Sequence, residues 1–370
     1  MKVLQMFGEP VSHGGQEAFV INLIKHISNN NISFDVLTPY YCDNNYYRDI
    51  ITARGGNVYA LGLNFSPGKS RLNIVKPVTK FFEEHKYDIV HIHSGSTSVL
   101  AVGSKLANDA GIEKIIVHSH CAADKKDLKY HFVRIITRFA LNKFPTHYAA
   151  CSLLAGESKF SKDIVKNKLV ILKNGIDLNE FSFNTESRDV MRTKLGFAKD
   201  CLVLGHVGRF SYQKNQEYII EILRDLLLKG VNAKILFVGT GETFENVINL
   251  SRKYDISQRI VFAGNINNVA DYMRAMDVFI LPSRFEGMPI VAVEAQAIGL
   301  PCIFSDNITR EADLTNNVCY LPVQSTDVGL WAEQCINFSN CYGADNKELL
   351  MHEGFDINST AETVVRLYKG

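Results

Sequence analysis

Short apolar runs alternate with amphipathic segments along the chain, and the first pair sets the pattern. Residues 2–7 form a strand-length apolar run that ends at Gly8, and residues 16–26 place Phe19, Val20 and Leu23 on one helical face. Further strands are predicted at 33–38, 58–61, 88–93, 114–118, 146–151, 168–173, 202–207, 234–238, 260–262, 277–281 and 301–304. Helices are predicted at 72–85, 98–109, from about 216, at 290–298 and at 360–368. This alternation predicts parallel sheets with helices on both faces.

The alternation stops and restarts once, which predicts two domains. A chain of 370 residues is too long for one ordinary core. The turn Asn174–Asp177 separates the two halves and is interpreted as a linker. We expect two Rossmann-like, doubly wound α/β domains facing a central cleft, at 1–173 and 174–354, with a helix in 355–370 that crosses back to the first domain. Loops at the carboxyl ends of the strands should line the ligand site.

Composition narrows the class of protein. Hydrophobic residues make up 46% of the chain and charged residues 21%, which is typical of soluble globular proteins. The net charge of +1 disfavours nucleic acid as a partner. There is no run of 18 apolar residues and no signal peptide, so a cytoplasmic location is expected, with peripheral contact at the inner face of the membrane left open. Eight cysteines without a CxxC pair suggest neither a zinc site nor a disulfide framework.

The stretch 277–301 carries the clearest candidate chemistry. A strand leads into a loop with Glu286, and a helix follows that is expected to have Pro289 as its first residue. Free amides at such a helix end attract phosphate. Glu294 lies eight residues after Glu286, inside the helix. Two carboxylates around an anion site suit a sugar, a diphosphate and a ribose in line. The alternative is a pair of ordinary surface glutamates.

Two cations follow the first strand of the second half. Arg209 and Lys214 lie five residues apart in one loop, at the carboxyl end of the strand 202–207. Cations at that place would neutralise a diphosphate leaving group. The alternative is a solvated loop with ordinary surface charges. The turn at 239–242 is interpreted as structural, with its backbone near a ligand.

The first half offers a glycine pair and a histidine. Gly14 and Gly15 follow the first strand and open a helix, where backbone can approach a phosphate, although a simple tight turn would look the same. His120 ends the strand at 114–118 and can exchange a hydrogen bond with a substrate hydroxyl. His118 lies within the strand and is expected to be structural.

Several common motifs are missing. Neither glycine loop reads GxGxxG, so a nicotinamide site is not supported. Residues 68–70 resemble the end of a P-loop, but Leu63 stands where its first glycine belongs. No DxD occurs, so a metal ion that bridges a nucleotide diphosphate has no obvious ligands. GxSxG is absent too, which removes the commonest hydrolase signal.

A basic amphipathic segment spans residues 124–144. Its apolar positions are Phe132, Val133, Ile136, Phe139 and Ala140. Its cations are Lys125, Lys126, Lys129, Arg134, Arg138 and Lys143, and the same half adds Lys69, Arg71, Lys76 and Lys80. Such a segment can lie on an anionic membrane surface. The alternative is a helix packed on its own sheet with a solvated charged face.

Taken together, these motifs resemble those of the retaining glycosyltransferases of family 4, which have two Rossmann-like domains (the GT-B fold). Glu286 and Glu294 match the E-x7-E motif of that family. The loops at 14–17 and 208–215 and the turn at 174–177 resemble its glycine-rich loop, its phosphate-binding loop and its interdomain turn, in the same order. The resemblance covers nearly the whole chain and is greatest to enzymes that build capsular or exopolysaccharide units.

The resemblance implies a role for each candidate residue. Arg209 and Lys214 would hold the donor diphosphate, Glu286 the donor sugar and Glu294 the ribose, while His120 would contact the transferred sugar. Backbone near the donor would come from Gly14, Gly15, Asn265, Ile266, Gly287, Met288, Pro289 and Ile290. The first domain would be the acceptor side and the second the donor side. No metal or other cofactor is implied.

The implied activity is retaining transfer of a hexosyl or N-acetylhexosaminyl group from a nucleotide-diphospho-sugar, expected to be a UDP-sugar. The acceptor would be a saccharide or a lipid-linked saccharide in surface polysaccharide synthesis. One departure is that residues 305–311 replace a second glycine-rich loop of the family. The alternatives are a sugar-nucleotide epimerase of the same fold and a non-catalytic nucleotide-sugar sensor.

Overall fold

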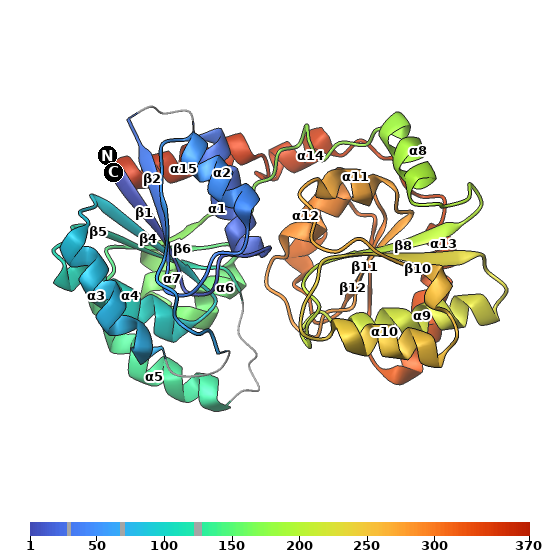
Figure 1. The fold of residues 1–370 in the computed structure, drawn as a ribbon, viewed down its shortest axis with the longest axis horizontal. Coiled ribbons are helices and arrows are strands. Elements are labelled where there is room, and N and C mark those ends of the chain that lie inside the picture. Colours follow the sequence, from blue (N-terminus) through green and yellow to red (C-terminus); the bar gives the residue numbers. More distant parts are fainter. Residues whose placement is uncertain (28–30, 67–70, 122–127) are drawn as a thin grey trace. The chain divides into compact units, whose positions relative to one another are not determined.

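The chain folds into two compact units. The computed structural model describes residues 1–27, 31–66, 71–121 and 128–370. One unit comprises Met1–Gly175 and Ile357–Gly370, and the other comprises Ile176–Asp356 (Figure 1). The last helix therefore belongs to the first unit, although the second unit precedes it in the chain.

The first unit is built on a parallel sheet. Its strands are β1 (Lys2–Phe7), β2 (Ser33–Thr38), β3 (Val58–Ala60), β4 (Ile89–Ser94), β5 (Lys114–Ser119), β6 (His147–Ala150) and β7 (Leu169–Ile171). They are ordered β3-β2-β1-β4-β5-β6-β7, and neighbouring strands are parallel. β1 and β4 lie next to each other inside the sheet. Their residues are almost all buried, because helices cover both faces of the sheet.

Helices cover both faces of this sheet. They are α1 (Gly15–His26), α2 (Asn45–Ala53), α3 (Val75–Glu84), α4 (Thr97–Asp109), α5 (Leu128–Lys143), α6 (Leu153–Lys159), α7 (Lys162–Asn167) and α15 (Ile357–Lys369). The C-terminal helix α15 lies beside α1 (Figure 1). It buries Ile357, Val364 and Tyr368 in the same apolar cluster as Phe19 of α1.

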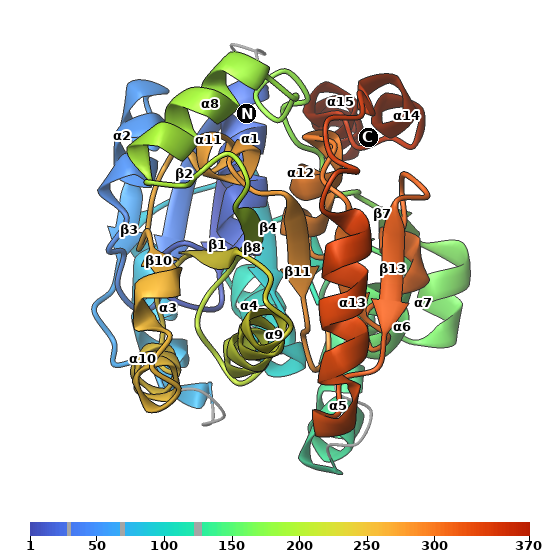
Figure 2. The same ribbon diagram turned by 90° about the vertical axis from the view of Figure 1, so that its right-hand side faces the viewer.

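The second unit repeats the plan. Its strands are β8 (Leu202–Val207), β9 (Ala233–Val238), β10 (Ile260–Phe262), β11 (Val278–Leu281), β12 (Cys302–Ser305) and β13 (Val318–Leu321). The sheet order is β10-β9-β8-β11-β12-β13, again with parallel pairs. Figure 2 shows β8 and β11 next to each other. In both units the first strand lies beside the fourth, which is the order of a doubly wound nucleotide-binding sheet.

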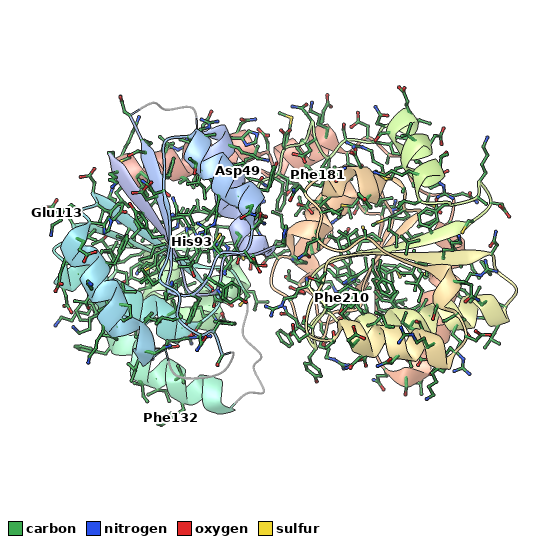
Figure 3. All side chains as sticks on the ribbon, viewed as in Figure 1. Asp49, His93, Glu113, Phe132, Phe181 and Phe210 are labelled. Atoms are coloured by element: carbon green, nitrogen blue, oxygen red, sulfur yellow. The ribbon has the colours of Figure 1, made fainter. Side chains whose placement is uncertain are left out.

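Helices again flank the second sheet. They are α8 (Thr185–Lys194), α9 (Gln216–Leu228), α10 (Phe244–Lys253), α11 (Val269–Arg274), α12 (Ile290–Ala297), α13 (Val328–Phe338) and α14 (Lys347–His352). Phe210, Phe237 and Trp331 are fully buried in the apolar core of this unit, and Trp331 lies on α13. Figure 3 labels Phe210.

The expected α/β architecture is confirmed, with local differences. The helix expected at 72–85 is a 3-10 turn, Leu72–Ile74, followed by α3 from Val75. Pro77 explains the break, because proline has no N–H to donate and is tolerated only in a first turn. Strand β13 was not predicted, because its four residues are all half-buried at the edge of the sheet and lack a strong pattern. No helix within the described ranges is long and apolar enough to cross a bilayer.

Candidate functional site

The loops after β8 and β11 meet at the point where the strand order of the second sheet reverses. Ligands of open α/β sheets bind at such a switch point, beyond the carboxyl ends of the strands. Lys214 in the first loop and Glu286 in the second are joined there by an ion pair of 2.7 Å between Nζ and Oε1. Both side chains are mostly buried, with 17% and 9% exposed. The structure thus brings together a cation and a carboxylate that are 72 residues apart in sequence.

Further hydrogen bonds fasten these two loops to each other. Gln213 donates to the carbonyl of Phe285 at 3.0 Å and accepts from the amide of Arg284 at 2.8 Å. The Arg284 guanidinium also donates to the side chain of Asn215 at 2.8 Å, and Asn215 donates to the carbonyl of Pro282 at 3.2 Å. Sequence analysis missed Arg284, since an arginine in a loop gives no periodic signal. It holds the loops that carry Lys214 and Glu286 in register.

A second set of hydrogen bonds, made by Gln216 and His206, fixes the loop after β8. Gln216, the first residue of α9, donates to His206 Nε2 at 3.2 Å and to the carbonyl of Arg209 at 2.9 Å. His206 contacts the carbonyl of Ile280 at 2.8 Å through Nδ1. Asn215 precedes the helix with a φ of 59°, in the left-handed region that asparagine tolerates. These bonds preorganise the path between Arg209 and Lys214.

Arg209 forms an ion pair of its own, separate from the Lys214–Glu286 pair. Its Nε is 3.2 Å from Oε2 of Glu242, and both side chains are more than half exposed. The loop after β9 supplies Glu242 and lies close to the loop after β8. A Cβ on Gly239 would lie 2.2 Å from the carbonyl oxygen of Gly208, so only glycine permits this approach. The turn expected to be structural therefore sets the position of Arg209.

Asn265 belongs to the same group of loops. Its side chain accepts a hydrogen bond of 3.2 Å from the hydroxyl of Thr240, and the carbonyl of Gly264 accepts one of 2.8 Å from the amide of Gly239. Asn265 and the neighbouring Ile266 thus lie at the carboxyl end of β10, next to the loop of β9.

Helix α12 begins at Ile290, and the expected place of Pro289 was wrong. Pro289 is the residue before the helix, with an extended ψ of 124°. It accepts the first helical bond from Ala292 through its carbonyl, so it starts the helix without being part of it. No side chain caps this end. The first two amides of the helix, those of Ile290 and Val291, are therefore available to an anion.

Glu294 lies on α12 and is buried, with 7% of its surface exposed. Burial, assisted by the charge of Glu180, raises the pKa of Glu294 to about 8. This carboxyl group is therefore protonated at neutral pH in the unliganded protein, and it can donate as well as accept a hydrogen bond. Ser283, which sequence analysis did not single out, is also buried, and its hydroxyl has no partner in the described part of the chain.

In the first unit, Gly15 is the first residue of α1. Gly14 is the residue before the helix, in extended conformation. A Cβ there would lie 2.2 Å from Oε2 of Glu17, because the Glu17 carboxyl folds back over the helix start. Burial raises the pKa of Glu17 to about 8, so a neutral acid occupies this end of the helix. The glycine at position 14 thus makes room for the Glu17 side chain. The interpretation of this loop as a phosphate-binding loop did not include Glu17.

Glu9 forms a second buried acid in the same loop region. Gln16 and Ser94 each donate to its carboxyl at 2.9 Å. Burial raises the pKa of Glu9, while those two donors lower it. Glu9 could not be recognised from sequence, because a single glutamate after a strand has no distinctive spacing.

His120 follows β5 directly and contacts a buried histidine. Its Nε2 is 2.9 Å from Nδ1 of His93, which lies on β4 in the centre of the unit (Figure 3). His120 is partly exposed, whereas His93 and His118 are fully buried. Burial lowers the pKa of all three rings, so they are neutral at physiological pH. The expected structural place of His118 agrees with this burial.

Helix α5 exposes a stripe of large apolar side chains. We call Phe132, Ile135, Ile136 and Phe139 the α5 stripe; their exposed fractions are 66, 73, 61 and 71%. Spacings of three and four residues place them on one helical face. Figure 3 shows Phe132 at the outer edge of the unit. Lys69, Lys125 and Lys126, and the side chains of Lys129 and Arg134, lie outside the described structure.

Two family models together span most of the chain. The model "Glycosyltransferase Family 4" matches residues 13–180, and "Glycosyl transferases group 1" matches residues 187–343. EpsF of Bacillus subtilis (strain 168) is 29% identical over 97% of this chain and 94% of its own. The UDP-Gal:alpha-D-GlcNAc-diphosphoundecaprenol alpha-1,3-galactosyltransferase of Escherichia coli is 30% identical over 64% of this chain and 62% of its own.

A solved structure gives the fold independently. HepE of Anabaena, crystallised with UDP and glucose, superposes with a TM-score of 0.78 over the full length of both chains, at 17% identity. This likeness concerns the fold, because identity is low. The two family models and the two doubly wound sheets agree with this fold. The chain therefore belongs to glycosyltransferase family 4 and has the GT-B fold.

Proposed function

We propose that this glycosyltransferase takes its sugar from a UDP-sugar and adds it to a saccharide or lipid-linked saccharide in surface polysaccharide synthesis. The observation that carries the proposal is the Lys214–Glu286 pair at the switch point of the second sheet, beside the uncapped start of α12. The galactosyltransferase named above uses UDP-Gal and a diphosphoundecaprenol-linked sugar, which supports the donor and the acceptor class.

The donor diphosphate binds to groups of this chain alone. Lys214, Arg209 and the first amides of α12 supply positive charge where the leaving diphosphate becomes more negative. Glu286 exchanges part of its contact with Lys214 for hydroxyls of the donor sugar. Glu294, a neutral acid before binding, accepts and donates hydrogen bonds to the ribose, and backbone near Asn265 and Ile266 flanks the base.

The chemistry is substitution with retention. The bond from the anomeric carbon to the diphosphate oxygen breaks through an oxocarbenium-like state, and the acceptor oxygen attacks from the same face. The leaving phosphate takes the acceptor proton. His120 contributes a hydrogen bond to the transferred sugar. Because the cations belong to side chains, no metal ion is required, and turnover should survive chelation by EDTA.

A mixed incubation tests the proposal. The protein is given UDP-glucose, UDP-galactose or a UDP-N-acetylhexosamine, with an undecaprenyl-diphosphate-linked sugar as acceptor, and the product is examined by mass spectrometry and by NMR of its anomeric proton. One added sugar with the α-anomeric signal of the donor is expected. A β product, or epimerised nucleotide-sugar formed without any acceptor, would overturn the proposal in favour of inversion or of an epimerase.

We propose further that α5 lies on an anionic membrane surface, where a lipid-linked acceptor would be found. The α5 stripe exposes four large apolar side chains, and Arg138 and Lys143 are exposed on the same helix. An apolar stripe with flanking cations is the arrangement of interfacial helices. The expected alternative, a helix with its apolar face packed inward, does not account for the exposure of Phe132, Ile136 and Phe139.

A further inference from the structure

A cavity in the first unit is lined by three cations. It has a volume of about 320 Å³ and lies between the second half of α5 and the start of α7. Arg138, Lys162 and Lys168 line it, and none of the three forms an ion pair with another described residue. Asp163 supplies a carboxylate, which accepts a hydrogen bond of 2.8 Å from Asn167. Three cations and one carboxylate leave the described lining with two positive charges in excess.

The rest of the lining is a fixed wall with two neutral donors. Tyr148 and Ile164 are buried, and the Tyr148 hydroxyl donates to the carbonyl of Leu141 at 2.8 Å, which ties β6 to α5. Ser161 accepts a hydrogen bond from the amide of Ile164 and keeps its own O–H to donate. The Asn142 side chain has no hydrogen-bond partner among the described residues. The cavity therefore offers cations for an anionic group and neutral donors beside them.

The cavity adjoins the α5 stripe. Arg138 follows Ile135 by three residues, and Asn142 follows Phe139 by three, so both line the same flank of the stripe. The apolar face of an interfacial helix enters the boundary between headgroups and acyl chains. The flank of such a helix then lies at the level of the lipid phosphates. With the stripe on a membrane, the cavity is therefore placed among headgroups.

We propose that this cavity binds the headgroup of an anionic phospholipid of the phosphatidylglycerol type. Arg138, Lys162 and Lys168 form charge-assisted hydrogen bonds to the phosphate oxygens. Asn142 and Ser161 bond to the hydroxyl groups of the glycerol. The proposal rests on the proposed membrane contact of α5 and adds to it a site for one lipid, whereas the stripe alone would bind any bilayer.

The position of the cavity favours a membrane lipid over the diphosphate of a lipid-linked acceptor. Lys168 precedes β7 and Tyr148 pairs with Leu169, so the cavity lies toward the amino ends of β6 and β7. His120 follows the carboxyl end of β5, three residues after Val117, which is the partner of Tyr148. Three strand residues span about 10 Å. A diphosphate in the cavity would therefore keep its attached sugar away from the loops at the carboxyl ends.

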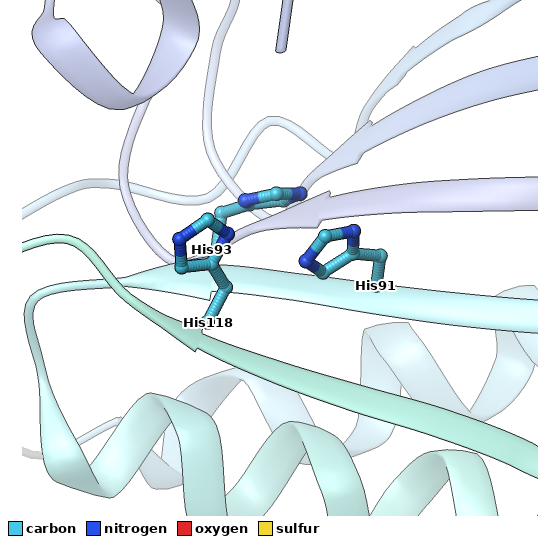
Figure 4. A group of neighbouring side chains, drawn as sticks. All are labelled: His91, His93 and His118. Carbon is cyan, nitrogen blue, oxygen red and sulfur yellow. The ribbon is translucent and has the colours of Figure 1, made fainter. Parts of the chain in front are cut away.

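The buried histidines are the other group of basic side chains in this unit. Ring nitrogens of His91, His93 and His118 lie within 4.8 Å of one another (Figure 4). Burial lowers the pKa of each ring, so all three are uncharged at neutral pH. They are also fully buried, out of reach of a lipid. The cavity at α5 and α7 is therefore the better place for a phosphate.

Vesicle binding at matched surface charge tests the site. The whole protein is mixed with phosphatidylcholine vesicles that contain either phosphatidylglycerol or oleate, adjusted to the same zeta potential, and co-sedimentation is measured. Because oleate supplies charge without a phosphate headgroup, the wild type is expected to bind phosphatidylglycerol vesicles about tenfold more strongly. Equal binding to both overturns the site and leaves the membrane contact intact. Binding to neither overturns the membrane contact, and the site with it.

The double variant Lys162→Gln, Lys168→Gln locates the preference. Both side chains are exposed, so thermal unfolding should be unchanged, while the preference for phosphatidylglycerol over oleate should disappear. Lys76→Gln with Lys166→Gln is the matched control, because it removes two exposed lysines of the same unit that do not line the cavity. This control should keep the preference. Loss of the preference in both double variants, or its retention in both, would overturn the site.

Inorganic phosphate distinguishes a lipid headgroup from a free anion as the occupant. It is added at constant ionic strength to the wild type bound to phosphatidylglycerol vesicles. Release is expected only at millimolar phosphate, since a free anion lacks the second contact that the α5 stripe gives to a lipid in a bilayer. Release at micromolar phosphate would show a site for the free anion and overturn the lipid as its ligand.

Discussion

At the scale of single residues, Lys214 and Glu286 define the candidate donor site. Their ion pair is short and mostly buried, so each charge depends on the other for compensation. Arg209 differs, because its contact with Glu242 is exposed. Substitution of the buried pair is therefore expected to lower stability. Substitution of the exposed Arg209 is expected to lower turnover with little effect on stability.

Glu286→Gln is expected to lower the free energy of unfolding by about 3 kcal/mol, because the Lys214 ammonium loses its counter-charge in a largely buried place. Lys214→Met should cost a similar amount for the converse reason. The double variant is expected to regain part of the loss, since no unpaired charge remains. Urea unfolding measures all three. Strictly additive costs would mean that the two side chains do not interact.

Arg209→Ala is expected to change stability by less than about 1 kcal/mol, because exposed ion pairs contribute little. Its turnover should nonetheless fall about 100-fold, as for the loss of a charge that stabilises a leaving group. Glu242→Ala removes the partner and serves as the control, with turnover near that of the wild type. Equal turnover in both variants would remove Arg209 from the proposed mechanism.

Glu294 gives a prediction with a definite sign. The pKa of Glu294 is raised to about 8 in the folded protein, whereas it ionises near 4.5 when unfolded. Between these values the folded state binds the additional proton, so this group lowers stability as pH rises from 4.5 to 8. Glu294→Gln removes the effect. The variant should therefore gain stability relative to the wild type between pH 5 and pH 8 in urea unfolding; a constant difference would show that Glu294 is ionised throughout.

At the scale of elements, the loops after β8, β9 and β11 are held by contacts that a sequence does not reveal. Every strand except β13 could be predicted, and so could α9 and the E-x7-E loop, because hydrophobic periodicity and glycine or proline signals are local. The contacts of Arg284 with Asn215, and of Gly239 with Gly208, join loops far apart in the chain. Pro289 was expected as the first residue of α12 but is the residue before it. Sequence could not separate these two positions, because only backbone angles distinguish a cap from a first turn.

Gly239→Ala tests the contact between the loops of β8 and β9. The new methyl group would lie against the Gly208 carbonyl and displace the segment that carries Arg209. We expect a stability loss of about 1–3 kcal/mol and a clear fall in turnover. Gly230→Ala is matched, because it also has a positive φ but meets no atom within 4 Å. Turnover should be retained in this control, so equal turnover in the two variants would refute the claim.

The exposed stripe on α5 predicts membrane binding. Phe139→Ser with Ile135→Ser should leave stability nearly unchanged, because both side chains are exposed. Co-sedimentation with vesicles of anionic phosphatidylglycerol should decrease markedly. Leu228→Ser on α9 is the control, since Leu228 is equally exposed in the other unit and should not affect binding. Binding of the double variant at the wild-type level would exclude the stripe as the contact.

At the scale of the whole molecule, buried titratable groups set the pH range of stability. Burial lowers the pKa of His91, His93, His118, His120 and His206. Below about pH 6.5 the unfolded chain binds protons that the folded chain does not, so stability falls as pH decreases. Glu9, Glu17 and Glu294 have raised pKa values in the folded protein. These three groups therefore lower the stability as pH rises.

The balance predicts greatest stability at about pH 6 to 7, with a decrease on both sides. Thermal unfolding from pH 5 to 9 measures it. The buried histidines could not be recognised as a group from sequence, because His91, His93, His118 and His120 meet only when β4 and β5 pair. Stability that rises steadily down to pH 5 would show that these rings are able to take up protons in the folded protein.

The two halves of the molecule repeat one sheet order, and the donor is assigned to the switch point of the second. Calorimetric titration of UDP into the wild type and into Lys214→Met tests this assignment most directly. UDP should bind the wild type, and the variant should bind it about 100-fold more weakly, since the ammonium is held beside the proposed diphosphate site. Equal affinity in the two proteins, or no binding to the wild type, would contradict the account.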